Sequence, residues 1–416
     1  MSKINASLWL DVRQAIGQLS HHRLRTALTL LGMVFGVGAV IAMLAVSEGG
    51  KRQALEMIEG MGLRNIIVDK LDAEGEALKE ARKYTPGLNI RDADAAAKTL
   101  PFIQRWAGAH EFRAWSLFSR YGDSRAKVLA VSPDYFDMTS LDAARGTLFS
   151  DDDDTRFAQV AVLGSTAART LFPNGGAVGG YVKINHLWVK VIGVLSDRQL
   201  SGDEFQGRSI GGEADQVFIP LQTGLSRLKT EALSAELDSI KFNLSGDIEP
   251  AAGAAAIDHL LRKRHSEQND YEITVPARLL AQHQQTQRIF TIVMSAVAGI
   301  SLLVGGIGIM NIMLASVMER KSEIGLLRAL GARENDVVRQ FLIETLVIAL
   351  IGAGLGVVLG VILAYVIAAF AGWAVAWSIV VIFVAIVTCV LIAVGFGVYP
   401  ALSAARLDPV LALQSD

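Results

Sequence analysis

The chain has 416 residues, of which 51% are hydrophobic and 19% charged, and its mean hydropathy is +0.38. This composition is too apolar for an ordinary soluble domain and indicates a membrane protein in contact with a lipid bilayer. The net charge of -2 excludes the global basic field that attracts nucleic acid, so no nucleic-acid partner is expected. The single cysteine, Cys389, excludes a disulfide within the chain and a cysteine-based zinc cluster.

Residues 1–25 predict an amphipathic helix at the cytoplasmic membrane surface. Its apolar stripe consists of Leu8, Val12, Ile16 and Leu19, spaced at helical intervals ahead of basic residues. A cleaved signal peptide is the alternative interpretation. The apolar run that follows is longer than the roughly 7–15 residues of a signal-peptide core, which disfavours that alternative.

Uncharged runs predict four transmembrane helices. No ionisable residue lies between Arg25 and Glu48, and such a run of about 22 residues matches one hydrocarbon core. The predicted segments are the first span at 26–48, a stalk and second span at 286–318, the third span at 345–370, an extracytoplasmic turn at 371–378 and the fourth span at 379–402. Because these spans lack charged residues, a proton-coupled or sodium-coupled carrier is disfavoured.

Lysine and arginine counts beside the spans predict the orientation. The segment before the first span has four lysines and arginines in all and the loop between the second and third spans has five, whereas the turn at 371–378 has none. Both termini, the loop at 319–344 and the tail at 403–416 are therefore expected in the cytoplasm. The segment 49–285 is expected outside it.

The segment 49–285 predicts a large extracytoplasmic α+β domain. Strands are expected at 65–68, 127–131, 159–163, 181–184, 187–194, 216–219, 239–244 and 271–275, and helices at 91–100, 165–171 and 250–264. Asn185 and His186 should form a hairpin turn.

No catalytic, cofactor-binding or metal-binding residue is expected on this chain. The run Asp151–Asp154 could suggest calcium, but consecutive side chains diverge, so a solvated acidic loop is the preferred interpretation. His259 and His265 are interpreted as a solvated helix face and not as metal ligands. The sequence contains neither a nucleophile elbow nor an H-E-x-x-H motif.

Glycines at four-residue spacing predict close helix packing in the membrane. They are Gly32 and Gly36 in the first span and Gly352, Gly356 and Gly360 in the third. Packing within the bundle and contact between two copies of the chain both remain open.

The loop 319–344 carries the candidate interaction site. A short charged helix is expected from Glu319 to Leu330, ended by Gly331. Its candidate docking residues are Glu319, Arg320, Lys321, Glu323, Ile324, Gly325, Leu327, Arg328 and Gly331. A helix that lies on the membrane surface and a helix that docks a soluble partner are the two alternatives.

The same region resembles the FtsX-like module of MacB-type permeases. The similarity lies in Met310–Met313, Glu319–Gly325, Arg328–Ala332, Gln340–Glu344, Tyr399–Leu402 and Ala404–Val410, and in the outer domain in Ser132–Phe136, Gly146, Val162–Gly164, Leu171–Phe172 and Val191–Val194. The resemblance implies a type VII ABC transporter permease, with the outer domain formed by a porter-like part and an inserted part at about 132–215.

The resemblance also implies partners. A separate cytoplasmic ATP-binding subunit would dock on the loop helix and carry the ATP and Mg, because the chain has no G-x-x-x-x-G-K-[ST] motif and no fused ATPase domain is expected. The chain itself would not be an enzyme. A second permease copy would complete a dimer, as a homodimer in preference to a heterodimer, and a periplasmic adaptor and an outer-membrane channel are further possible partners.

The expected function is mechanotransmission in an exporter of the bacterial inner membrane. Motion driven by the ATPase would pass to the periplasmic domain and export an antibiotic, a peptide or another small molecule, without a substrate conduit through the spans. Two alternatives remain open. One is FtsX-like transmembrane signalling to a cell-wall enzyme, and the other is lipoprotein release.

Overall fold

The computed structural model describes residues 23–71, 75–197, 204–205, 208–209, 212–230, 233–371, 375, 377, 379–408 and 412. The amphipathic helix expected at 1–25 lies almost wholly outside these residues, as does most of the turn expected at 371–378. The chain forms two compact units, one made of the residues up to Arg52 together with those from Gln285 onward, and the other of Gln53–Gln284.

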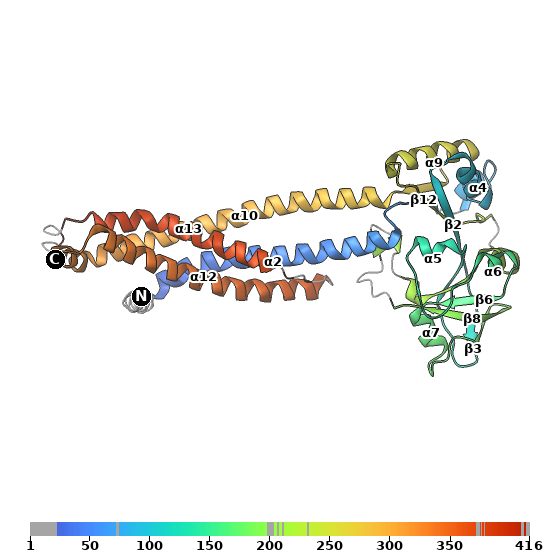
Figure 1. Ribbon diagram of the computed structural model, residues 1–416, viewed down its shortest axis with the longest axis horizontal. Helices are drawn as coiled ribbons and strands as arrows, with labels where there is room; N and C mark the ends of the chain where they lie inside the picture. The colour runs from blue at the N-terminus through green and yellow to red at the C-terminus, as the bar shows by residue number, and fades with distance from the viewer. Residues whose placement is uncertain are drawn as a thin grey trace. The chain divides into compact units, whose positions relative to one another are not determined.

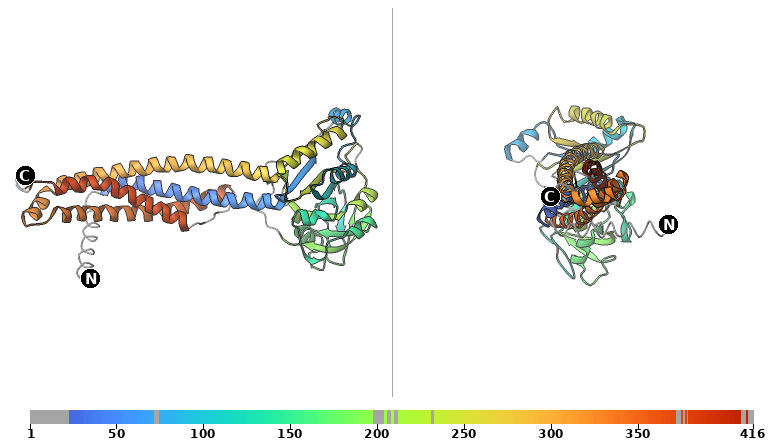
Figure 2. Two further views of the ribbon diagram at one scale, coloured as in Figure 1. Left: turned by 45° about the horizontal axis from the view of Figure 1, so that its top comes forward. Right: turned by 90° about the vertical axis from the view of Figure 1, so that its left-hand side faces the viewer.

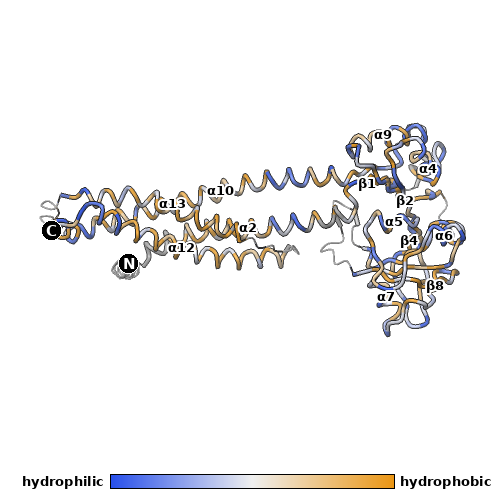
Figure 3. The backbone as a smooth tube through the Cα atoms, in the orientation of Figure 1, coloured by the Kyte–Doolittle hydropathy of each residue, from blue (hydrophilic) through white to orange (hydrophobic). Residues whose placement is uncertain are grey.

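The first unit is helical. Its helices are α2 (Arg23–Met61), α10 (Pro276–Glu319), α11 (Lys321–Ala329), α12 (Glu334–Ala371) and α13 (Ile379–Ala405). Four of them, all except α11, are long and apolar enough to cross a membrane. They run alongside one another as a bundle (Figures 1 and 2), and the hydrophobic colouring continues along α12 and α13 (Figure 3).

The second unit is built on one mixed sheet of 11 strands. The strand order is β13-β1-β12-β2-β4-β11-β6-β8-β7-β3, and β5 pairs with β8. The strands are β1 (Asn65–Lys70), β2 (Ile103–Phe112), β3 (Leu117–Ser119), β4 (Lys127–Val131), β5 (Ala143–Gly146), β6 (Val160–Leu163), β7 (Tyr181–Ile184), β8 (Leu187–Leu195), β11 (Gln216–Pro220), β12 (Ser239–Leu244) and β13 (Tyr271–Thr274). The strands β9 (Glu204–Phe205) and β10 (Arg208–Ser209) form a separate pair.

Short helices cover the sheet. They are α3 (Gly75–Ala81), α4 (Ile90–Thr99), α5 (Asp134–Met138), α6 (Asp151–Thr155), α7 (Ser165–Leu171), the 3-10 helix η1 (Gly212–Asp215), α8 (Leu221–Arg227) and α9 (Pro250–Arg264). The expected architecture, four transmembrane helices with an α+β domain, is confirmed. The expected boundary of an inserted part at 132–215 stays a prediction. β11 pairs with β4 on one side and with β6 on the other, so the sheet is continuous and shows no break that would mark this boundary.

Two apolar layers lie on the two faces of the sheet. Val189 and Val191 of β8 belong to the larger layer, whereas the neighbouring Ile192 packs against the smaller one. In the smaller layer the rings of Phe136 and Phe149 lie 4.9 Å apart between centroids. The alternation follows from the two-residue period of a strand, which sends successive side chains to opposite faces.

Of two local predictions, the structure confirms the hairpin turn at Asn185 and His186 and contradicts the acidic loop at Asp151–Asp154. Ile184 pairs with Leu187, and Asn185 has a φ of +54°, so the hairpin turn predicted at Asn185 and His186 is confirmed. The acidic run does not form a loop. Ser150 caps it through a reciprocal capping box with Asp153, and residues 151–155 form α6, because carboxylates in the first turn of a helix favour its N-terminal dipole.

A buried ionic cluster, formed by Asp92, His265 and Asp270 with two arginines, joins α4, the end of α9 and the start of β13. His265 Nε2 lies 3.1 Å from Asp92 Oδ2, and its Nδ1 lies 2.7 Å from Asp270 Oδ1. Arg264 Nε contacts Asp92 at 2.6 Å, and Arg82 Nη1 contacts Asp270 at 3.4 Å. Because both imidazole nitrogens face carboxylates, the ring donates two hydrogen bonds as an imidazolium.

The interpretation of His265 as a solvated residue is therefore wrong, since its exposed fraction is 1%. Burial alone would lower the pKa of His265, but the hydrogen bonds to Asp270 and Asp92 outweigh it and raise the pKa to about 9. Burial alone would likewise raise the pKa of Asp92, and the hydrogen bonds from His265 and Arg264 instead lower it. His259 lies on the exposed side of α9, as expected.

Candidate functional site

The candidate site is the short helix α11 between the long helices α10 and α12. Gly331, just beyond α11, has a φ of +102°, which lets the chain leave the helix in a left-handed conformation without a Cβ clash. Asp336 then caps the start of α12 by accepting a hydrogen bond from the Arg333 backbone at 3.0 Å. These two features fix α11 as a separate helix of nine residues.

Arg320 attaches the start of α11 to α12. Its Nε donates to Glu323 Oε2 at 3.0 Å, and its Nη1 lies 3.6 Å from Glu344 Oε2. Its guanidinium carbon also lies 5.8 Å from the centroid of the Phe341 ring, so the cation contacts an aromatic face. Arg320 is thus mainly a structural residue of the site and contributes little free surface to a partner.

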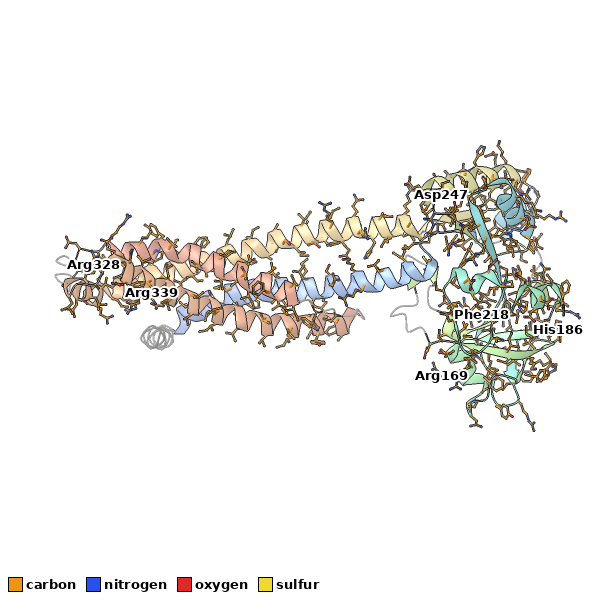
Figure 4. All side chains as sticks on the ribbon, viewed as in Figure 1. Arg169, His186, Phe218, Asp247, Arg328 and Arg339 are labelled. Atoms are coloured by element: carbon orange, nitrogen blue, oxygen red, sulfur yellow. The ribbon has the colours of Figure 1, made fainter. Side chains whose placement is uncertain are left out.

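Arg328 attaches the other end of α11. Its Nη2 donates to Glu334 Oε1 at 3.3 Å across the turn that contains Gly331. The labelled Arg328 and Arg339 lie at the same end of the helical unit (Figure 4). Both ends of α11 are therefore held by ion pairs to α12.

The apolar side chains of α11 divide between two directions. Ile324 is 3% exposed and packs into the core of the helical unit, and Gly325 is buried beside it. Leu326, Leu327 and the C-cap residue Leu330, which we count with the helix, are 53%, 45% and 78% exposed. A free apolar face on a helix that is anchored at both ends is typical of a protein-docking surface.

Among the other predicted docking residues, Glu319, Glu323 and Gly331 are exposed and Lys321 is half-buried. Leu326 and Leu330 are exposed but are not among the predicted docking residues. The 3.6-residue period turns the predicted Ile324 inward and places Leu326 beside Leu330 on the outside.

The spaced glycines face other helices of the same chain. A Cβ on Gly32 would lie 3.3 Å from Gly305 Cα, and one on Gly36 would lie 3.0 Å from Leu302 Cδ2. Gly32 and Gly36 of α2 thus pack on α10.

The glycines of α12 pack on α2. A Cβ on Gly352 would lie 3.4 Å from Leu30 Cδ2, one on Gly356 2.7 Å from Val37 Cβ, and one on Gly360 2.8 Å from the Gly38 carbonyl oxygen. In a bilayer such close backbone approach is a main source of helix association. All five predicted glycines therefore serve contacts within the bundle of one chain.

In the described part of the chain, no group of three or more His, Cys, Asp or Glu side chains is arranged to hold a metal ion.

Comparison with known proteins gives the family. The model of the MacB-like periplasmic core domain matches residues 26–260, and that of the FtsX-like permease C-terminal region matches residues 295–409. The chain belongs to the MacB/FtsX-like permeases. It is thus an ABC transporter permease with a periplasmic core domain, and it is a multi-pass protein of the inner membrane.

Two named relatives illustrate the similarity. The macrolide export ATP-binding/permease protein MacB of Azoarcus sp. (strain BH72) is 37% identical over 97% of this chain and 59% of the relative. The pyoverdine export ATP-binding/permease protein PvdT of Pseudomonas aeruginosa is 34% identical over 99% of this chain and 59% of the relative. The chain thus spans about three fifths of the length of these relatives.

Solved structures also match in part. The periplasmic region of MacB from Actinobacillus actinomycetemcomitans is 22% identical and covers 56% of this chain and 97% of its own, with a TM-score of 0.44. The extracellular domain of the noncanonic ABC-type transporter YknZ from Gram-positive bacteria is 16% identical and covers 50% of this chain and 99% of its own, with a TM-score of 0.39.

Proposed function

We propose that this permease is the membrane part of an ATP-driven exporter and that its ATPase docks on the exposed leucines of α11. The observation that carries the proposal is the combination of an apolar face, formed by Leu326, Leu327 and Leu330, with ion pairs that fix the helix at both ends. A rigid apolar helix can transmit force, because it cannot yield locally when a partner pushes on it.

The ATP and Mg belong to the ATP-binding subunit in this proposal. This chain contains no phosphate-binding loop of the G-x-x-x-x-G-K-[ST] type. The relatives are named as ATP-binding/permease proteins, which supports a transporter that needs both an ATP-binding part and a permease. The permease would act without enzymatic activity of its own, as a homodimer, with both termini in the cytoplasm.

The periplasmic core domain would receive the motion and move the substrate outward, with an adaptor and an outer-membrane channel as further partners. The names of two relatives, which refer to macrolide export and pyoverdine export, favour a small-molecule substrate. They favour export over signalling to a cell-wall enzyme and over lipoprotein release.

The first test is a pull-down of the tagged chain from its native membranes. The same pull-down is then repeated with a variant that carries a charge on the apolar face. We expect an ATP-binding protein in stoichiometric amount, and we expect Leu330→Asp to remove most of it, because docking would bury a carboxylate in an apolar contact.

Asn335→Asp is the matched control, since it adds the same charge at an exposed position in the first turn of α12, where a helix tolerates an acid. Full retention of the ATP-binding protein by Leu330→Asp would contradict the docking proposal. Recovery of a cell-wall hydrolase or of a lipoprotein carrier in place of an adaptor would contradict the export proposal.

A further inference from the structure

Strand β13 leaves one edge of the large sheet unpaired. It is the last strand in the sheet order and pairs with β1 alone. The Leu71 N–H donates to the Asp270 carbonyl oxygen at 2.9 Å, so the peptide groups of Asp270 point toward β1. Along an antiparallel strand, the peptide groups of successive residues point alternately toward and away from the neighbouring strand. The peptide groups of Glu272 and Thr274 therefore face β1, and those of Tyr271 and Ile273 face the open side.

The opposite end of the same sheet is closed by the chain itself. At β3 the Ser119 N–H donates to the Gly122 carbonyl oxygen at 2.8 Å, and the Ser124 N–H donates to the Leu117 carbonyl oxygen at 2.9 Å. Proteins usually protect a sheet edge by such local cover, by keeping the edge strand short, by charged side chains or by proline. Within the described residues, β13 is a strand of four residues that carries one charged side chain, Glu272, and no strand lies on its outer side.

A groove runs beside this open edge. Helix α9 and β13 enclose a cavity of about 380 Å³, whose α9 side is lined by Ala251, Ala254 and Ala255 and whose strand side is lined by Tyr271 and Ile273. Alanine side chains leave room between a helix and a strand where larger residues would fill it. The groove thus has alanine side chains along the helix, main-chain donors and acceptors along the strand, and polar and charged side chains in the rest of its lining.

The charged residues that line the groove are two acids, Asp258 and Glu272, and two arginines, Arg262 and Arg278. Asp258 accepts hydrogen bonds from Arg262 Nε at 2.9 Å and from the Tyr271 hydroxyl at 3.0 Å, and Glu272 also has an interaction partner. Arg278 is exposed and has no ion pair within the described part of the chain. A guanidinium in this state is a ready partner for a carboxylate.

We propose that this groove binds an extended acidic segment of another protein, which adds to β13 as a further strand. Only an extended polypeptide presents donors and acceptors at the spacing of a strand, so the open edge itself selects this class of ligand. The segment would bond the peptide groups of Tyr271 and Ile273, place small apolar side chains against the alanines of α9, and direct a carboxylate to Arg278. This site is separate from α11 and does not depend on ATPase docking.

The test begins with a crosslink in the intact system. The full chain with p-benzoylphenylalanine in place of Ala255 is irradiated in its native membranes, and the crosslinked peptides are identified by mass spectrometry. We expect the crosslinks to converge on one short segment that carries acidic residues or a chain terminus. The same probe at Ala252, which is exposed on α9 but does not line the groove, should give no such product.

A synthetic peptide of the crosslinked segment then tests strand addition on the purified full chain in nanodiscs. Ile273→Pro removes the main-chain donor that faces the open side and also replaces a side chain that packs against the core of the domain. Because that donor bonds no strand of the sheet and proline is tolerated on a strand edge, the fold should persist. We expect about a tenfold loss of affinity for Ile273→Pro and none for Ile273→Val. The bound peptide should also slow hydrogen exchange of residues 271–275.

Ala255→Trp gives a second measurement in case Ile273→Pro disturbs the fold. It should fill the groove and abolish peptide binding, whereas Ala252→Trp should not. Three results would each overturn the proposal: crosslinks to a second copy of this chain, crosslinks to lipid or to nothing at position 255, or peptide affinity that is unchanged in both Ile273→Pro and Ala255→Trp.

Discussion

Protonated His265 joins three segments of the core domain that are far apart in the sequence. Asp92 comes from α4, His265 caps the end of α9, and Asp270 precedes β13. A cation at the C-terminus of a helix also interacts favourably with the helix dipole. The stability of this domain should therefore depend on the charge of one imidazole.

Stability should fall in alkaline solution because the pKa of His265 is raised. The folded-state pKa of about 9 exceeds the ordinary value of 6.5, so the stabilisation is complete below about pH 6.5 and is lost as pH rises through about 9. This difference corresponds to about 3 kcal/mol. Pulse proteolysis of the full chain in urea, from pH 6 to pH 10, should show the decrease in the free energy of unfolding of the core domain.

His265→Gln should be less stable at pH 7, because it leaves Asp92 and Asp270 buried without a charged partner between them. It should also lose the alkaline decrease. The lowered pKa of Asp92 affects stability in acid solution. The stabilisation of the fold by the Asp92 carboxylate is present above about pH 3.8 and is lost as the pH falls. An alkaline decrease of the same size in His265→Gln would assign the effect to another group.

The error over His265 shows which features a sequence hides. Its position beside Lys263 and Arg264 is typical of a solvated basic helix end. Its partner Asp92 is 173 residues away in the sequence, and no local pattern signals that contact. Ionic partners of this kind depend on the tertiary fold, so spacing and periodicity cannot reveal them.

At the scale of the element, uncharged runs were sufficient to predict the membrane helices. Lipid requires long segments whose backbone groups are satisfied internally, and such segments are visible in composition alone. The ten-residue strand β2 was missed. Its sequence, IQRWAGAHEF, mixes charged, small and aromatic residues, and its burial depends on pairing with β12 and β4 on either side.

Packing of α12 on α2 should tolerate no added methyl group at the contact. A Cβ on Gly356 would lie 2.7 Å from Val37 Cβ and 3.1 Å from the Val34 carbonyl oxygen. We expect Gly356→Ala to destabilise the helical unit by about 1–3 kcal/mol, as overpacking does elsewhere. Thermal unfolding in nanodiscs measures this change.

Gly354→Ala is the matched control on the same helix, since nothing lies within 4 Å of its Cβ position. It should leave stability unchanged or slightly raised, because alanine favours a helix more than glycine does. Equal destabilisation by the two substitutions would show that Gly356 owes its effect to helix propensity and not to the contact with α2.

At the scale of the whole molecule, Arg320 is the residue through which α11 and α12 act as one body. It contacts Glu323 of α11 and both Phe341 and Glu344 of α12. If α11 receives the push of an ATPase, this attachment should decide whether the push reaches a membrane helix. Docking and transmission should then be separable by mutation.

Arg320→Gln should retain the ATPase in a pull-down. The variant permease should nevertheless stimulate ATP hydrolysis by that ATPase severalfold less, because α11 would move without α12. Glu344→Gln should behave alike, and the double variant should be little worse than either single variant, since both remove the same pair. Lys321→Gln, which removes a cation with no ion pair among the described residues, should keep stimulation. Additive losses in the double variant would show that the two residues act separately.

The pairing of β1 with β13 has a further consequence for how this protein can be altered. α2 runs into β1 and β13 runs into α10, so the chain enters and leaves the core domain through two strands that lie side by side, with Ile67 opposite Thr274. A domain whose two ends meet can be removed or exchanged without stretching the chain that carries it. Periplasmic domains could therefore be transplanted between permeases, with new substrates or partners acquired by replacing one cassette while the membrane helices stay as they are.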